Sequence, residues 1–131
     1  MAAKAFCYQE AGERYGGSPT LLRAIALHES GEKQGVTHAN SDGSVDYGVM
    51  QINSQHLPFL ARYGVTEEVL LSNSCLNVKI GAWILSNFFK QYGSTWDVVG
   101  AYGAGVRQQN AATRRRFKGV LRDFPAAFRT G

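Results

Sequence analysis

The sequence predicts a single, mainly α-helical domain that carries one short β-hairpin. Apolar residues recur at helical spacing over most of the chain. Turn-forming residues cluster in one stretch, residues 38–47, which cannot form a long helix. With 131 residues, 44% of them hydrophobic, the chain can bury one core, and it has no apolar run long enough to span a membrane. We therefore expect residues 1–131 to form one domain.

The helical spacing predicts seven helices. The one with the clearest limits begins at Pro19, because Ser18 is a favourable N-cap and proline suits the first helical position. This helix should end before Gly31. The only β-structure is expected in a hairpin around residues 42–47. The predicted helices cover residues 3–15, 19–30, 55–63, 67–71, 76–92, 96–104 and 111–124.

Glu29 is the first candidate catalytic residue. It follows Leu22 by seven residues and Ile25 by four, which places it on the buried stripe of the predicted helix. A carboxyl that is desolvated there should have a raised pKa and could donate a proton near neutral pH. The alternative is a glutamate at a helix end that pairs with Lys33 or is hydrated.

Asp46 is the second candidate, and it lies in the polar hairpin. A carboxylate there keeps hydrogen bonds and water, so it should stay ionised. One protonated and one ionised carboxyl are what cleavage of a glycosidic bond uses. The alternative is that Asp42 and Asp46 only shape the turn. A calcium loop counted from Asp42 is excluded, because it would need glycine in place of Tyr47 and glutamate in place of Asn53.

Three motifs in order resemble the soluble lytic transglycosylases, whose fold is lysozyme-like. The resemblance runs from about Phe6 to about Gly105 and is closest to the small specialised members that serve type III and type IV secretion and conjugation systems. It implies an α+β lysozyme-like fold with a cleft between the hairpin and the helical lobe. The motifs are residues 29–30 (ES), 48–53 (GVMQIN) and 101–105 (AYGAG), supported by Gly64, Cys75, residues 81–85 (GAWIL) and Trp96.

A second resemblance concerns the hairpin. Residues 41–54 are similar to the hairpin of c-type lysozymes that carries their second catalytic aspartate, and Asp46 matches that aspartate. The separation of seventeen positions between Glu29 and Asp46 also agrees with that family. Most lytic transglycosylases work with the glutamate alone, so the chain resembles a transglycosylase with an added lysozyme-like carboxylate.

The resemblance implies a mechanism that needs no cofactor and no metal. Glu29 would protonate the oxygen of the β-1,4 bond between MurNAc and GlcNAc and then take the proton from the sugar's 6-hydroxyl, leaving 1,6-anhydro-MurNAc ends. Asp46 would add electrostatic stabilisation. Where the family usually has asparagine the chain has Gly103, so any role of that side chain is absent. The substrate-binding residues that the resemblance implies are Met50, Gln51, Asn53 and Tyr102, the last of which would orient the glutamate.

Cys7 and Cys75 are the only cysteines. An even count in a chain that otherwise looks secreted makes one disulfide plausible, and the corresponding cysteines are paired in secretion-linked relatives. The alternative is a pair of buried free thiols. The chain carries no signal peptide, so we expect it to be the mature form of an exported, periplasmic protein.

The formal charge of +4 suits an anionic polymer such as the cell wall, but also nucleic acid or membrane headgroups. We expect a monomer that acts on peptidoglycan for a secretion or conjugation apparatus and that does not bind nucleic acid. The basic cluster at residues 114–116 most simply forms a solvated helix face. The alternatives are a hydrolytic lysozyme, a non-catalytic glycan-binding module and, from another class, a basic nucleic-acid binder that would not depend on Glu29. His28, His38 and His56 lack the spacing of metal ligands.

Overall fold

The computed structural model describes residues 6–92, apart from the side chains of residues 88, 91 and 92. The predicted helices 96–104 and 111–124 lie outside the described residues, as do Tyr102, Gly103 and the basic cluster at 114–116. The described helices are α2 (Tyr8–Tyr15), α3 (Pro19–Ser30), the 3₁₀ turn η1 (Ser54–His56), α4 (Leu57–Ala61), α5 (Glu67–Ser72) and α6 (Ser74–Tyr92). The strands are β1 (Thr37–Ala39), β2 (Val45–Tyr47) and β3 (Ile52–Asn53).

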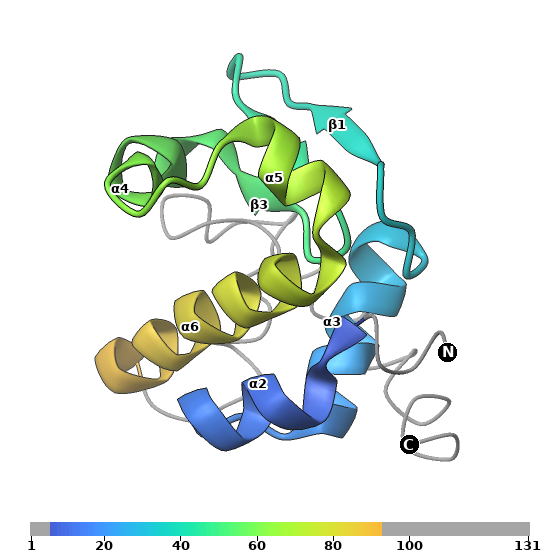
Figure 1. Ribbon diagram of the computed structural model, residues 1–131, viewed down its shortest axis with the longest axis vertical. Helices are drawn as coiled ribbons and strands as arrows, with labels where there is room; N and C mark the ends of the chain where they lie inside the picture. The colour runs from blue at the N-terminus through green and yellow to red at the C-terminus, as the bar shows by residue number, and fades with distance from the viewer. Residues whose placement is uncertain (1–5, 93–131) are drawn as a thin grey trace.

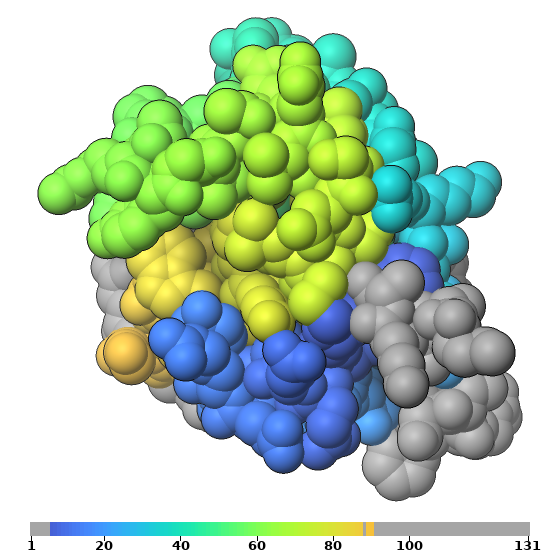
Figure 2. All heavy atoms as spheres, in the orientation of Figure 1, coloured from blue at the N-terminus to red at the C-terminus, as the bar shows by residue number. Residues whose placement is uncertain are grey.

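Helix α6 runs through the middle of the molecule (Figure 1). Helices α2 and α3 lie on one side of it, and the sheet lies on the other side together with α4 and α5. In the space-filling view the surface of α6 is visible between α2 and the part built from α4 and α5 (Figure 2). Residues 6–92 are mainly helical and contain one small antiparallel sheet, which confirms the predicted lysozyme-like α+β fold class.

Helix α3 has the limits that its end residues predict. The Ser18 side chain accepts a hydrogen bond from the amide of Leu21 at 3.3 Å, which satisfies one of the free donors at the helix start. Gly31 ends the helix in a left-handed conformation with φ 67°. Leu22 and Ile25 on its apolar face are fully buried, so the face that precedes Glu29 belongs to the core.

Two of the predicted helices are not continuous. The helix predicted for residues 3–15 is interrupted at Cys7, which has a left-handed φ of 57°, so α2 begins at Tyr8. The helix predicted for residues 55–63 is a 3₁₀ turn followed by the short α4, because Pro58 has no amide hydrogen and fits only the first helical turn.

The β-structure is larger than the predicted hairpin. Strand β2 pairs with β1, as expected for a hairpin, but β3 adds a third antiparallel strand on its other edge. In this register Asp46 lies opposite Asn53. The third strand has only two residues, too short to show an alternating pattern in the sequence.

Interactions at the N-terminal side tie α2 to the end of α3. The Tyr8 hydroxyl donates to Oε2 of Glu32 at 2.7 Å, and Nε of Arg23 contacts the same oxygen at 3.2 Å. Burial, followed by the hydrogen bond to Glu32, raises the pKa of Tyr8 above its ordinary value. The segment that follows α3 is therefore fixed on the α2 side.

Cys7 and Cys75 form a disulfide, which confirms the predicted pair. Their Cα atoms are 5.1 Å apart and 68 positions separate them in the sequence. The bridge joins the residue before α2 to the first turn of α6.

We predict that Cys7→Ser lowers the free energy of unfolding by about 2–5 kcal/mol, because an open chain gains conformational freedom when it unfolds. Thermal melts with and without reductant would measure this. Reductant should lower the melting temperature of the parent protein but leave that of the variant unchanged. Peptide mapping without reduction should recover the two cysteines as one linked fragment. Alkylation of both thiols before reduction would contradict the prediction.

Candidate active site

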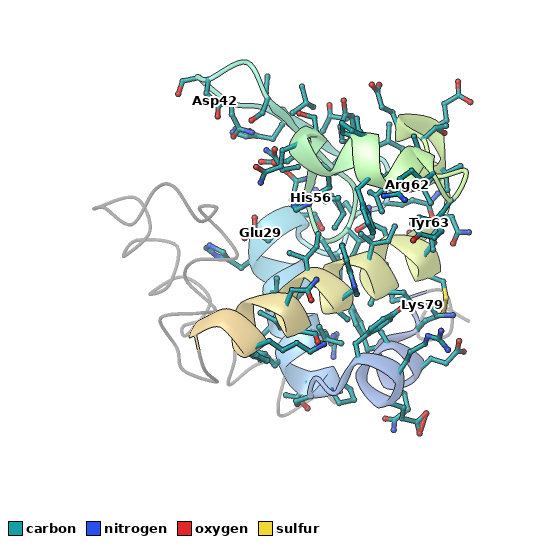
Figure 3. All side chains as sticks on the ribbon, turned by 90° about the vertical axis from the view of Figure 1, so that its left-hand side faces the viewer. Glu29, Asp42, His56, Arg62, Tyr63 and Lys79 are labelled. Atoms are coloured by element: carbon teal, nitrogen blue, oxygen red, sulfur yellow. A yellow bond between two sulfur atoms is a disulfide. The ribbon has the colours of Figure 1, made fainter. Side chains whose placement is uncertain are left out.

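Glu29 lies in the last turn of α3, on the side of the molecule opposite Arg62, Tyr63 and Lys79 (Figure 3). The residue is partly exposed, but its Oε2 atom is buried from solvent. The helix therefore places a carboxyl with one desolvated oxygen where α3 meets the segments of the sheet.

Ser30 attaches this end of α3 to the turn that follows β2. Its hydroxyl donates to the carbonyl oxygen of Val49 at 2.7 Å and lies 3.2 Å from that of Ala26 in its own helix. The Ser30 hydroxyl oxygen also accepts a hydrogen bond from the amide of Lys33 at 3.1 Å. The residue next to Glu29 thus holds the turn at residues 48–51 against the helix end.

Asp46 lies in the middle of β2, and two amide side chains hold its carboxylate. Asn53, directly opposite on β3, donates to Oδ1 at 2.8 Å, and Asn40 donates to Oδ2 at 3.2 Å. Asn53 also accepts the amide of Gln55 and so caps η1. Each carboxylate oxygen has a fixed donor, so the orientation of Asp46 is set by the sheet.

The turn at residues 48–51 contains two residues with left-handed backbone. Gly48 has φ 77° and Gln51 has φ 53°. The Gln51 side-chain nitrogen donates to the carbonyl oxygens of Gly48 at 3.0 Å and Val36 at 3.2 Å, so it stabilises the turn itself. Non-glycine residues in this conformation cost free energy and occur most often at functional sites.

Of the residues predicted to bind substrate, Met50 is fully buried in the core. Gln51 and Asn53 are partly exposed, with the amide nitrogen of each engaged as described above. Contact of any of these side chains with a sugar remains a prediction.

Sequence reasoning missed the side chains that hold these segments in place. The partner of Asp46 on β3 could have been found from strand pairing, but only if a two-residue strand had been recognised. Asn77 is a polar residue between the apolar Leu76 and Val78 of α6, and it is fully buried. A buried polar residue in an apolar helix segment is the signal that could have identified it.

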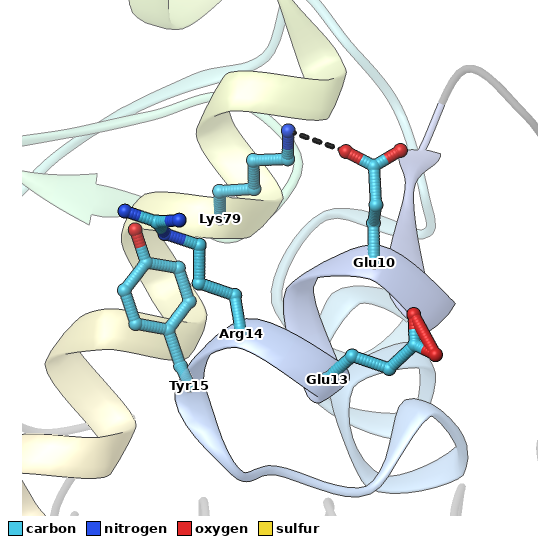
Figure 4. Close-up of a pocket in the computed structure, with 5 residues that line it drawn as sticks. All are labelled: Glu10, Glu13, Arg14, Tyr15 and Lys79. Atoms are coloured by element: carbon cyan, nitrogen blue, oxygen red, sulfur yellow. Dashed lines mark ion pairs between the residues drawn. The ribbon is translucent and has the colours of Figure 1, made fainter.

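A cavity of about 740 Å³ lies elsewhere, between α2 and α6 (Figure 4). Charged side chains of both signs line it, and Nζ of Lys79 contacts Oε2 of Glu10 at 2.7 Å. It contains none of the predicted site residues, and Lys79 lies on the opposite side of the molecule from Glu29 (Figure 3). The cavity lining consists of Glu10, Glu13, Arg14, Tyr15 and Lys79.

Among residues 6–92, no three histidine, cysteine, aspartate or glutamate side chains converge where a metal ion could bind. His56, at the end of η1, has a pKa below its ordinary value because burial disfavours the charged imidazole. None of the helices in the described part of the chain combines the length and apolar character that a membrane span requires.

Comparison with known proteins identifies a matching family model and several similar proteins. Residues 6–120 match the family model described as Transglycosylase SLT domain. Protein IpgF of Shigella flexneri is 42% identical over 114 residues, which cover 87% of this chain and 75% of that protein. Invasion protein IagB of Salmonella typhimurium strain SL1344 is 43% identical over 115 residues, 88% of this chain and 72% of that protein. A peptidoglycan-binding-like protein of Escherichia coli O157:H7 is 41% identical over 122 residues, covering 88% and 73%.

We predict that Gly48→Ala destabilises the protein by about 3 kcal/mol or more, through left-handed strain and overpacking. An added Cβ would collide with Nδ2 of Asn77 and lie 2.7 Å from the carbonyl oxygen of Leu70. Gly43→Ala is the matched control, because Gly43 also has positive φ but has no atom within 4 Å of an added Cβ. That control should cost about 1–2 kcal/mol. If chemical denaturation shows the same loss of unfolding free energy in both variants, the close approach of Asn77 and Leu70 to Gly48 does not affect stability.

Proposed function

Because the chain belongs to the transglycosylase SLT domain family and is a peptidoglycan lytic transglycosylase, we propose the bond and product of its reaction. It cleaves the β-1,4 bond between MurNAc and GlcNAc and leaves 1,6-anhydro-MurNAc ends. The observation that carries this proposal is the setting of Glu29. A carboxyl with a buried oxygen ends α3, and Ser30 beside it binds the turn that follows the strand of Asp46.

Glu29 acts as acid and then as base. Desolvation favours the neutral carboxyl, which donates its proton to the glycosidic oxygen as the bond breaks. The resulting carboxylate takes the proton of the 6-hydroxyl, whose oxygen attacks the anomeric carbon of the same sugar. One proton is given and one is recovered, so the enzyme is unchanged and no water is consumed.

Asp46 stabilises the positive charge that develops on the sugar ring. The hydrogen bonds from Asn40 and Asn53 support this role, because a carboxylate that is already oriented need not reorganise during the reaction. The same arrangement favours a second candidate function, hydrolysis by a true lysozyme, in which water would replace the 6-hydroxyl. The chemical form of the product distinguishes the two reactions.

We propose that the enzyme works as a monomer in the periplasm, where it opens peptidoglycan locally for a secretion or conjugation apparatus. The Salmonella relative is named an invasion protein, and the Escherichia coli relative is named as peptidoglycan-binding-like. The disulfide suits an oxidising compartment. The test of this role is whether deletion of the gene impairs assembly of the apparatus and whether the wild-type enzyme, but not Glu29→Gln, restores it.

We predict that Glu29→Gln reduces cleavage of purified peptidoglycan by on the order of 10³-fold or more, because the amide cannot donate and recover the proton. Glu13→Gln is the control, since Glu13 is an exposed carboxyl on α2 and its loss should leave the rate unchanged. Clearing of a peptidoglycan suspension measures the rate, and the melting temperature should be nearly the same in both variants. Substantial activity in Glu29→Gln would refute the assignment.

We predict that Asp46→Asn lowers turnover by on the order of 10²-fold, less than Glu29→Gln, with little change in glycan binding. Asp42→Asn tests the same hairpin at an exposed carboxylate that accepts hydrogen bonds from the amide and the hydroxyl of Ser44. Mass spectrometry of the parent digest should show 1,6-anhydro ends. Full activity in Asp46→Asn would reduce Asp46 to a turn residue, and reducing ends would assign the enzyme to the lysozymes.

A further inference from the structure

Asn77 is a fully buried amide that makes three hydrogen bonds from the first part of α6. Its Oδ1 accepts the amide of Met50 at 2.8 Å. Its Nδ2 donates to the carbonyl oxygens of Tyr47 at 3.0 Å and Leu70 at 2.9 Å. Both donors of the amide and its acceptor are therefore used, and all three partners are main-chain atoms.

Two of these bonds hold the two ends of one turn. Tyr47 is the last residue of β2, and Met50 lies three residues later. Between them Gly48 approaches Nδ2 of Asn77 so closely that a side chain would collide with it. The third bond, to Leu70, fixes the amide to the end of α5. The turn at residues 48–51, together with Tyr47 before it, is thereby clamped to α5 and α6.

The same turn connects the two segments that carry the candidate carboxylates. Asp46 immediately precedes Tyr47 on β2, and the carbonyl of Val49 accepts the hydroxyl of Ser30, the neighbour of Glu29. A displacement of this turn would move β2 relative to the end of α3. Positional errors of about 1 Å can cost on the order of 10²-fold in rate, even when they arise outside the reacting groups.

We infer that Asn77 is a positioning residue for the reaction: it sets the place of Asp46 and of the 48–51 turn relative to Glu29. The inference rests on the proposed function, since it concerns the geometry of that site. Asn77 acts through the main chain, because its side chain is fully buried and all three of its hydrogen-bond partners are main-chain atoms.

Asn77→Asp tests this role with almost no change of shape. The carboxyl can still accept the amide of Met50, but only its protonated form can donate to a carbonyl oxygen, and its ionised form repels both Tyr47 and Leu70. We expect turnover on soluble glycan strands to fall at least tenfold at pH 8. The rate relative to the parent enzyme should be higher at pH 5 than at pH 8, because the buried carboxyl is protonated there.

Val78→Ala is the matched control. Val78 is the next residue on α6 and is equally buried, but its side chain has no polar atom. The variant should lose stability by leaving a cavity, yet keep the parent's turnover and pH profile when assayed well below its melting temperature. Equal activity in the two variants at every pH, with both fully folded, would overturn the inference.

Hydrogen–deuterium exchange gives a readout that does not depend on activity. In Asn77→Asp the peptide that contains residues 47–52 should exchange faster than in the parent, whereas in Val78→Ala it should not change selectively. If Asn77→Asp does not fold, Asn77→Ser decides, because a shorter hydroxyl keeps one donor and one acceptor. Parent-like turnover and exchange in the serine variant would overturn the inference, and lowered turnover with faster local exchange would support it. The Glu29→Gln assay tests the proposed function separately, so failure of one does not imply failure of the other.

Discussion

A stretch of main chain that crosses the interior of a protein must find a partner for each of its polar groups. The turn at residues 47–51 meets this constraint without a regular ladder of hydrogen bonds. The amides of Gly48 and Gln51 donate to main-chain carbonyls, those of Val36 and Gly48. Side chains from three directions supply further partners: Asn77 of α6, Ser30 of α3 and Gln51 of the turn itself. The position of the sheet relative to α3 therefore depends on side chains that lie far apart in the sequence.

This constraint explains why the motif residues are what they are. Gly48 has no side chain because Asn77 and Leu70 occupy the space where one would lie. Ser30 carries a short hydroxyl that can reach a carbonyl across the interface. In the two motifs that lie within the described residues, Gly48 and Ser30 hold the backbone in place, and Glu29 supplies the carboxyl of the proposed reaction. A motif can thus include residues whose visible role is to fix the backbone around the candidate site.

The elements that local rules determine were predictable from the sequence. Helix α3 begins and ends where Ser18, Pro19 and Gly31 place it, since capping and left-handed glycine act over a few residues. The break at Cys7 and the strand β3 were not predictable in this way. The first accompanies a disulfide to a cysteine 68 positions away, and the second exists only as a partner of β2.

In the candidate site, too, features set by local sequence were predictable and features set by distant contacts were not. The sequence provided both carboxylates as candidates, from the apolar stripe of α3 and from the motifs, and their catalytic roles stay predictions. It did not identify the contacts that hold them, such as the hydrogen bond from Asn40 to Asp46 or the hydrogen bonds of Asn77 to the turn after β2. These contacts arise from tertiary packing. For those contacts the sequence offers only indirect signals, a polar residue in an apolar helix being the clearest.

The two carboxyls occupy different surroundings, and the difference matches the division of labour in the proposed reaction. Glu29 lies in the last turn of a helix whose apolar face lies in the core, and one of its oxygens is hidden from solvent. Asp46 lies on a strand where two amide side chains donate to its oxygens and fix their orientation. A helix and a sheet provide these environments separately, so the reaction requires a rigid connection between them. The turn after β2, clamped by Asn77 and bound to Ser30, is the connection that the structure provides.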